Sequence, residues 1–430
     1  MPAFRSPAAC CASSTPEAVN GPGDPAGAGE AGARPLAGVR VLEMGTLIAG
    51  PFCARVLAEF GAEVIKIESP DGGDPLRNWR KLHEGTSLWW LAQARNKKSV
   101  AVNLKEAEGQ EIVRRLAAEA DVVVENFRPG TLEGWNIGWP QLSALNPGLV
   151  MVRLSGYGQT GPYSDRPGFG AIGEAMGGLR HLSGYPDRPP VRVGVSIGDS
   201  IAALYGAIGA LVALRHREVN GGRGQVVDVA LYEAVFSLME SMLPEYDLFG
   251  FVRERSGAAL PGIVPSNTYG TRDGRHLVIG ANNDSIFRRL MRAMGRPDLA
   301  DDPGLADNAG RVARTAEVDG VIEAWTRSLD LDEALRLLEA AQVPAGRIYD
   351  IADIAADPHY AARGMLPAFP LPGGGTIRLP GIVPRLEATP GGTDWIGPPL
   401  GAHTREVLRA AGYDDGHIDA LASRRVIGLS

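Results

Sequence analysis

The sequence predicts an α/β fold, with a Rossmann-like, doubly wound parallel sheet in a large domain and a smaller α+β domain after it. Three observations support this prediction. Between residues 39 and 155, short apolar runs alternate with helical segments, which is the pattern of βαβ units. The chain has 430 residues and is 44% hydrophobic, which is enough for two cores. After the glycine-rich residues 221–225, a hairpin and a series of helices replace the alternation.

The first βαβ unit is the most clearly marked. Residues 39–44 are expected to form a strand and residues 45–50 a turn, and Pro51 suits the first position of a helix. That helix ends at Gly61, and residues 64–67 form the second strand. Further strands are expected at residues 99–104, 121–127 and 149–155, and a helix is expected over residues 106–120.

The second half is expected to contain shorter elements. A strand at residues 226–229 leads into a helix from about Tyr232, and Arg272-Asp-Gly274 is the turn of a hairpin. Helices are expected at residues 285–294, 312–327, 331–341, 404–411 and 417–423, and strands within residues 364–386. The predicted organisation is therefore a disordered tail (1–34), a large domain (35–224), a small domain (225–355) and a C-terminal segment returning to the large domain (356–430).

Composition excludes several classes of protein. A formal charge of −7 without a long Lys/Arg run argues against nucleic-acid binding, and the seven scattered histidines do not have the spacing of a metal site. Cys10, Cys11 and Cys53 are too few for a disulfide framework, which favours the cytoplasm. The apolar run 201–214 is shorter than the roughly 18 to 20 residues that a membrane span needs. The tail, residues 1–34, matches neither a secretory signal nor a transit peptide.

Asp199 is the first candidate for chemistry. An apolar, strand-like run over residues 193–198 precedes it, and a helix that is apolar all round follows it. Such a helix is expected to be buried, which places Asp199 at the floor of a site. A helix N-terminus stabilises an ionised carboxylate, although an ordinary N-cap has the same position.

The first turn offers a second reading. It resembles a nucleotide-binding unit, and Glu68 ends the second strand, where a dehydrogenase would hold a ribose. However, Gly45 and Gly50 are five residues apart and do not form Gly-x-Gly-x-x-Gly, which disfavours a nicotinamide enzyme.

Other polar segments fall at predicted strand ends. The cations of residues 95–98 and Lys105 suit phosphates or a solvated loop, and Asn126 and Phe127 offer an amide and an aromatic face. The glycine-rich loop 156–162 suits either an oxyanion site or a flexible turn.

Together these segments resemble the class III CoA-transferase family, which includes formyl-CoA transferase, carnitine CoA-transferase and succinyl-CoA-dependent dicarboxylate CoA-transferases, with α-methylacyl-CoA racemase as a sister branch. The resemblance covers the chain from about residue 35 to its end. The matching stretches, in the family's order, are residues 35–42, 61–68, 73–75, 96–99, 124–130, 156–162, 197–199, 222–225 and 399–408.

The resemblance implies an interlocked homodimer with Asp199 as the nucleophile that forms an aspartyl-CoA thioester. It implies a CoA thioester as substrate and no tightly bound cofactor or metal. The implied CoA contacts are Thr46, Leu47, Ile48, Val102, Lys105, Asn126 and Phe127. Two family arginines are replaced by Ser69 and Gly134, so Arg77, Lys97 or Arg128 is expected to help to hold the adenine and phosphates.

The branch is indicated by further residues. The racemase branch has Gly-His-Asp where this chain has Gly168-Phe169-Gly170, and phenylalanine cannot transfer a proton. The glycine tetrad of formyl-CoA transferase is replaced by residues 262–267 and 280–283, which resemble the dicarboxylate branch. Arg180, His181 and Arg192 are candidate partners for a second carboxylate.

The predicted function is a soluble, cytoplasmic CoA-transferase that moves CoA from an acyl-CoA, such as succinyl-CoA, to a carboxylic or dicarboxylic acid. Its expected partners are the acyl-CoA and a small acid, without nucleic acid or membrane. The alternatives are an acyl-CoA racemase or isomerase of the same fold, a NAD-dependent oxidoreductase and a non-catalytic CoA-binding protein.

Overall fold

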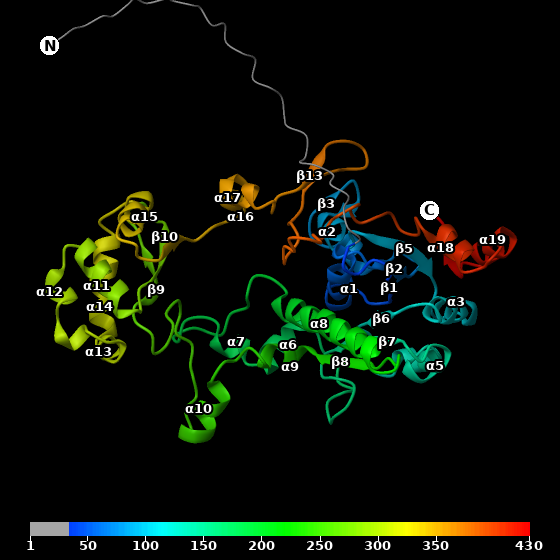
Figure 1. Ribbon diagram of the computed structural model, residues 1–430, viewed down its shortest axis with the longest axis horizontal. Coiled ribbons are helices and arrows are strands. Elements are labelled where there is room, and N and C mark those ends of the chain that lie inside the picture. Colours follow the sequence, from blue (N-terminus) through cyan, green and yellow to red (C-terminus); the bar gives the residue numbers. More distant parts are fainter. Residues whose placement is uncertain (1–33) are drawn as a thin grey trace, which may run out of the picture.

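The computed structural model describes residues 34–430, so the expected disorder of the tail, together with Cys10 and Cys11, lies outside the described residues. A seven-stranded sheet organises the large unit (Figure 1). Its strands are β1 Arg40–Glu43, β2 Glu63–Glu68, β5 Lys97–Val102, β6 Val122–Glu125, β7 Val150–Ser155, β8 Val226–Ala230 and β14 Ile427–Gly428.

The sheet order confirms the predicted fold class. The strands follow the order β14-β5-β2-β1-β6-β7-β8, and all neighbours are parallel except β14, which is antiparallel to β5. The six parallel strands, counted along the chain, have the spatial order 3-2-1-4-5-6 of doubly wound folds. The reversal of strand order falls between β1 and β6, where such sheets bind ligands.

Helices cover both faces of the sheet. One face packs against α1 Ala49–Glu59, α8 Ile197–Val219 and α9 Leu231–Phe236. The opposite face packs against α3 Ala107–Ala117, α5 Trp139–Leu145, α18 Thr404–Ala410 and α19 Asp415–Ser423. The remaining elements before α8 are η1 Pro75–Asn78, β3 Leu82–His83, β4 Thr86–Ser87, α2 Leu88–Gln93, α4 Thr131–Gly134, α6 Gly170–Met176 and α7 Leu179–Leu182.

Helix α8 differs from its expected length and burial. It has 23 residues, and a window of mean hydropathy 1.7 makes it long and apolar enough to cross a membrane, although it packs against β7, β8 and α1 as a core helix. Small residues allow this close packing, since a Cβ added at Gly206 would lie 3.2 Å from Cys53 Sγ. The expectation of burial on all sides is wrong for the single chain, because Ile208 and Val212 are more than half exposed.

The elements β9 to α15 of the smaller unit lie apart from the large sheet (Figure 1), and this unit has its own core. Its antiparallel sheet consists of β9 Ser266–Gly270, β10 His276–Gly280 and β11 Ala345–Arg347. The helices that accompany this sheet are α11 Asp284–Ala293, α12 Pro297–Ala300, α13 Asn308–Ala313, α14 Thr315–Thr326 and α15 Leu331–Ala340, with η2 Pro303–Leu305. The hairpin at Arg272-Asp-Gly274 forms as expected between β9 and β10.

The start of the smaller unit needs a correction. A boundary at residue 225 was expected, but β8 pairs with β7, and α9 packs against α6 and α8. Residues 226–236 therefore belong with the large sheet, and we propose a boundary near Val264, where the second core begins. Helix α10 Met242–Phe249 lies on the connection between the units.

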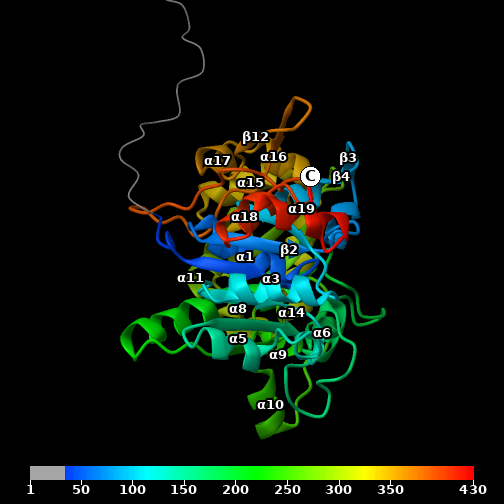
Figure 2. The same ribbon diagram turned by 90° about the vertical axis from the view of Figure 1, so that its right-hand side faces the viewer.

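The last segment runs back to the large unit. It contains α16 Ile351–Ala356, α17 Pro358–Ala362 and a hairpin of β12 Ala368–Pro370 with β13 Thr376–Arg378, which turns at the three expected glycines, 373–375. Helices α18 and α19 then lie beside the β2 and β5 side of the sheet (Figure 2), and β14 pairs with β5.

Candidate active site

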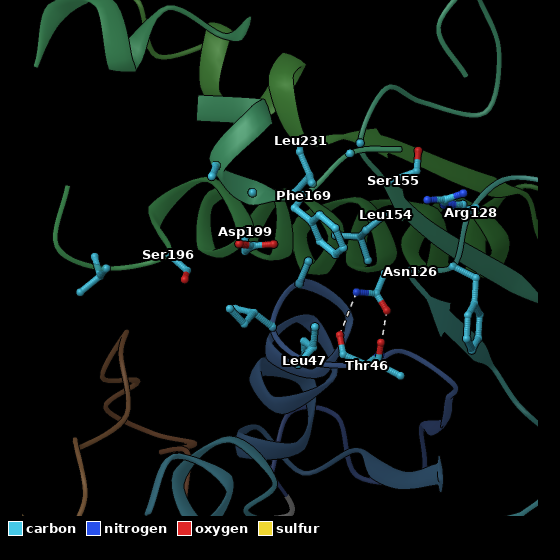
Figure 3. A pocket seen from close by; sticks show the side chains of 18 of the residues that line it. Thr46, Leu47, Asn126, Arg128, Leu154, Ser155, Phe169, Ser196, Asp199 and Leu231 are labelled. Atoms are coloured by element: carbon cyan, nitrogen blue, oxygen red, sulfur yellow. Dashed lines mark hydrogen bonds between the residues drawn. The ribbon is translucent and has the colours of Figure 1, made fainter. Parts of the chain in front are cut away.

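The turn after β1 is held in place by the residue that follows β6. The Asn126 side chain accepts a hydrogen bond from the Thr46 N–H (2.7 Å) and donates one to the Thr46 carbonyl (2.9 Å; Figure 3). A Cβ added at Gly45 would lie 3.0 Å from the Asn126 Oδ1, so glycine allows this close approach. The amide of Asn126 is therefore largely committed to shaping the turn.

The same turn contains a strained residue. Leu47 has φ 65°, and its N–H donates to the Asp74 carboxylate at 3.1 Å. Asp74 is buried and pairs with Lys66, whose Nζ also lies 2.7 Å from Glu43. Although burial alone would raise it, the Lys66 ammonium holds the pKa of Asp74 below its usual value. A buried ion network therefore fixes the backbone at the switch point.

Two of the cations expected to hold phosphates are structural instead. The Lys97 ammonium is buried between Glu43 (2.7 Å) and the Pro51 carbonyl (2.6 Å), and burial lowers its pKa to about 8. Arg77 pairs with Glu68 at 2.8 Å, and its guanidinium stacks 3.7 Å from the Trp90 ring centroid. Neither side chain lines the cleft at the switch point, because each is committed to a buried carboxylate.

A cleft of about 440 Å³ opens at the switch point. Thr46, Leu47, Ile48, Asn126 and Phe127 line it, as does Asp199 from the other side (Figure 3). A second hollow of about 140 Å³ shares Thr46 and Phe127 with it and is lined by Val102, Lys105 and Ser69. The structure therefore brings the seven expected CoA contacts to two adjoining cavities.

The charge of the cleft is opposite to that of the chain. Its lining contains four arginines, and Asp199 is the one acidic residue among the described residues that line it. The arginines are Arg80, Arg128, Arg166 and Arg192. The formal lining charge is thus +3 in a protein of net charge −7, which suits a ligand with several phosphate or carboxylate groups.

Asp199 lies in the first turn of α8, as expected, but the segment before it is not a strand. Residues 191–196 form an irregular and largely exposed run along the cleft, because Gly194 interrupts the short apolar pattern and no strand of the sheet lies beside it. Gly198 belongs to α8 and lies against the Gly170 carbonyl, with 3.0 Å between that oxygen and an added Cβ. The nucleophile candidate is thus packed against α6.

The acidity of Asp199 is unusual for a helix N-terminus. Burial, followed by the charge of Glu174, raises the pKa of Asp199 to about 6, while Arg192 acts in the opposite direction. Desolvation therefore outweighs the stabilisation that a helix N-terminus gives to an ionised carboxylate. Asp199 is mostly ionised at pH 7 and more basic than an ordinary aspartate.

Glu174 is a site residue that the sequence prediction missed. Its side chain is 1% exposed, and it pairs with Arg180 at 3.3 Å and lies 4.0 Å from Arg192. His181 faces Glu254 instead, at 3.4 Å. The signal in the sequence was a lone acid among the small and apolar residues 170–178. Of the three expected carboxylate partners, Arg192 lines the cleft, whereas Arg180 and His181 do not.

Phe169, the residue expected to distinguish this chain from the racemase branch, also faces the cleft. Phe169 lines the cleft as the N-cap residue of α6 and is 69% exposed (Figure 3). Its ring has no ionisable group, so it cannot accept or donate the proton that racemisation requires. Within residues 34–430, no group of three or more His, Cys, Asp or Glu side chains is arranged to hold a metal ion.

A doubly wound sheet with a cationic cleft at its switch point defines an α/β protein whose cleft suits an anionic, nucleotide-like ligand. Comparison with known families is more specific. Residues 36–404 match the model described as CoA-transferase family III, so the chain belongs to that family and is an enzyme of this class.

Relatives agree with this assignment. The chain is 54% identical to succinyl-CoA–D-citramalate CoA-transferase of Chloroflexus aurantiacus, over 92% of this chain and 98% of that protein. It is 34% identical to human succinyl-CoA:glutarate CoA-transferase, over 92% and 90%. Among solved structures, a CaiB/BaiF family protein from Brucella suis has a TM-score of 0.78 and 35% identity, over 88% of this chain and 100% of that one.

Proposed function

We propose that this enzyme transfers CoA from succinyl-CoA to a small dicarboxylic acid through a thioester on Asp199. The observation that supports this proposal most strongly is the charge of the cleft lining. One carboxylate, Asp199, lies there among four arginines. The names of the relatives support the donor and the acceptor class: one acts on citramalate and another on glutarate, both with succinyl-CoA. D-Citramalate is the first acceptor to test, because that relative is 54% identical.

The proposed reaction uses covalent catalysis without net proton transfer. An Asp199 oxygen attacks the thioester carbonyl, and the C–S bond breaks to give a mixed anhydride and CoA thiolate. The thiolate attacks the aspartyl carbonyl, the C–O bond breaks, and succinate leaves with the electron pair. The acceptor carboxylate then attacks the aspartyl thioester and expels the thiolate. Attack of that thiolate on the acceptor acyl group of the second anhydride forms the product and restores the Asp199 carboxylate.

The two adjoining cavities supply the proposed CoA site. We place the adenine side of CoA near Val102 and Lys105 and the pantetheine arm along Thr46, Leu47, Ile48, Asn126 and Phe127 toward Asp199. This path joins the smaller hollow to the larger cleft through their shared residues. This chain has Ser69 and Gly134 at two positions where the family has arginines. Arg128, which is exposed at the cleft, supplies a positive charge in their place.

We propose that the enzyme is a homodimer. The resemblance implies an interlocked homodimer, and the single chain exposes many large apolar side chains on α8, α10 and the residues after α10, which supports burial by a second copy. These include Leu204, Ile208, Leu211, Val212, Leu243, Tyr246, Leu248, Phe249, Phe251 and Val252. Light scattering of the purified enzyme measures whether it is a dimer. We also propose that the enzyme is soluble and cytoplasmic, which cell fractionation measures.

The proposed nucleophile is tested by intact mass spectrometry. Incubation with succinyl-CoA should add the mass of CoA minus water, and the adduct should be absent in Asp199→Asn. Asp187→Asn, which changes an exposed acid outside the cleft, is the matched control and should retain the adduct. An adduct in Asp199→Asn together with undiminished transfer to D-citramalate, malate and glutarate would reject the mechanism.

A further inference from the structure

Two carboxyl groups share the protein interior at the start of α8. Glu174 lies on α6, one turn after Gly170, and its side chain is 1% exposed. A Cβ added at Gly170 would lie 1.9 Å from the Asp199 Oδ2, and one added at Gly198 would lie 3.2 Å from the Glu174 Cγ. The short helix α6 therefore packs both Gly170 and Glu174 against the start of α8, and Glu174 is not among the residues that line the cleft.

The Glu174 carboxylate is only partly paired. One oxygen accepts a hydrogen bond from Arg180 (3.3 Å), whereas the other is buried and has no hydrogen-bond partner within the described part of the chain. The nearest cation to that second oxygen is Arg192, at 4.0 Å, which is too long for a hydrogen bond. An incompletely paired buried carboxylate acts strongly on a neighbouring negative charge, because little solvent screens it.

We propose that Glu174 is a positioning residue that destabilises the ionised form of Asp199 by like-charge repulsion and thereby drives formation of the enzyme–CoA thioester. The proposal rests on the proposed function. In the half-reaction, the Asp199 carboxylate and succinyl-CoA become the aspartyl-CoA thioester and free succinate, with no proton gained or lost. The enzyme loses the Asp199 charge in this step, so repulsion from Glu174 disappears in the product.

The groups around Glu174 define the sign of this effect. Arg180 on α7 and Arg192 in the segment before α8 face it, together with Asp199 on α8. Helix α9, which packs against α6, has one acid, Glu233, whose carboxylate accepts a hydrogen bond from the Tyr232 hydroxyl at the surface. Glu174 disfavours the negative charge on Asp199 and raises its pKa, whereas Arg192 favours that charge and lowers the pKa.

The effect is measurable as an equilibrium constant. Succinyl-CoA and succinate are mixed with the enzyme at several ratios at pH 8, and the fraction carrying CoA is read by intact mass. Glu174→Gln keeps the side-chain shape and the contact with Arg180 but removes the charge. If Glu174 accounts for about one pKa unit, the equilibrium constant should fall about tenfold, and the acid limb of the rate should move about one unit lower in pH.

Two further variants separate this role from a structural one. Glu174→Asp keeps the charge and should retain most of the parent equilibrium constant. Arg192→Met should change the constant in the opposite direction, toward more adduct, and this variant keeps the test valid if Glu174→Gln fails to fold. An unchanged constant and acid limb in folded Glu174→Gln, or less adduct in Arg192→Met, would overturn the inference. Absence of any adduct in the parent enzyme would instead overturn the proposed function on which the inference rests.

Discussion

Gly170→Ala offers a sharp test of how the active site is packed. Gly170 begins α6 in an ordinary helical conformation, so alanine introduces no backbone strain and favours the helix by up to about 1 kcal/mol. The added methyl group, however, would lie 1.9 Å from the Asp199 Oδ2 and 2.6 Å from its Cγ. The substitution therefore acts mainly on the position of the Asp199 carboxylate.

The expected loss follows from the size of this overlap. To reach ordinary contact of about 3.5 Å, the Asp199 oxygen must move by roughly 1.5 Å. Displacement of a reacting group by about 1 Å costs on the order of 100-fold in rate, so kcat/KM for succinyl-CoA should fall by at least that factor. The melting temperature should stay close to that of the parent, because the helix gains what the local contact loses.

The assay measures transfer from succinyl-CoA to D-citramalate by chromatography of the two thioesters. Gly320→Ala is the matched control, since Gly320 lies in α14 with nothing within 4 Å of an added Cβ. This control should keep its activity and gain up to about 1 kcal/mol in stability. Parent-like kcat/KM in Gly170→Ala would refute the placement of Asp199 against α6.

Three other predictions concern the same machinery. The proposed attack by the Asp199 anion, whose pKa is raised to about 6, predicts that kcat/KM should halve at pH 6 and fall about tenfold per unit below it; a midpoint near pH 4 would contradict this. Lys66→Met leaves Asp74 buried without its cation, and Glu43 with Lys97 alone, and should cost about 3 to 5 kcal/mol in denaturant unfolding; a loss under about 1 kcal/mol would argue against a buried network. Asn126→Ala removes two hydrogen bonds from the first turn, each worth about 1 kcal/mol. The KM for succinyl-CoA should therefore rise about tenfold or more, while kcat changes less. A kcat that falls by as large a factor as KM rises would count against a positioning role.

Local patterns were sufficient to predict the six parallel strands of the large sheet and the first turn, but not the short edge strand β14. Strand β1, helix α1 and strand β2 follow from apolar periodicity, Pro51 and Gly61, and each strand lies within one or two residues of its expected bounds. The position of Asp199 in the first turn of a helix was predictable for the same reason, because the long apolar run marks α8.

Burial of charged groups was not predictable from local patterns. Lys97 and Arg77 look like exposed cations in the sequence, yet Lys97 on β5 meets Glu43 from β1, two strands away, and Arg77 on η1 meets Glu68 from β2. The sequence pattern does not specify the strand order that brings these partners together. Glu174 was missed for a similar reason, since its importance depends on α6 packing beside α8. The expected strand before Asp199 failed because a strand needs a neighbour as well as an apolar pattern.

The pairing of β14 with β5 also constrains how the protein is made. A ribosome delivers Lys97–Val102 long before its edge partner Ile427–Gly428. Until residues 427 and 428 have been synthesised, β5 carries an open β edge, which is a template for association with other chains. Replacing Ile427 and Gly428 by prolines, which cannot donate to the ladder, should therefore lower the soluble yield.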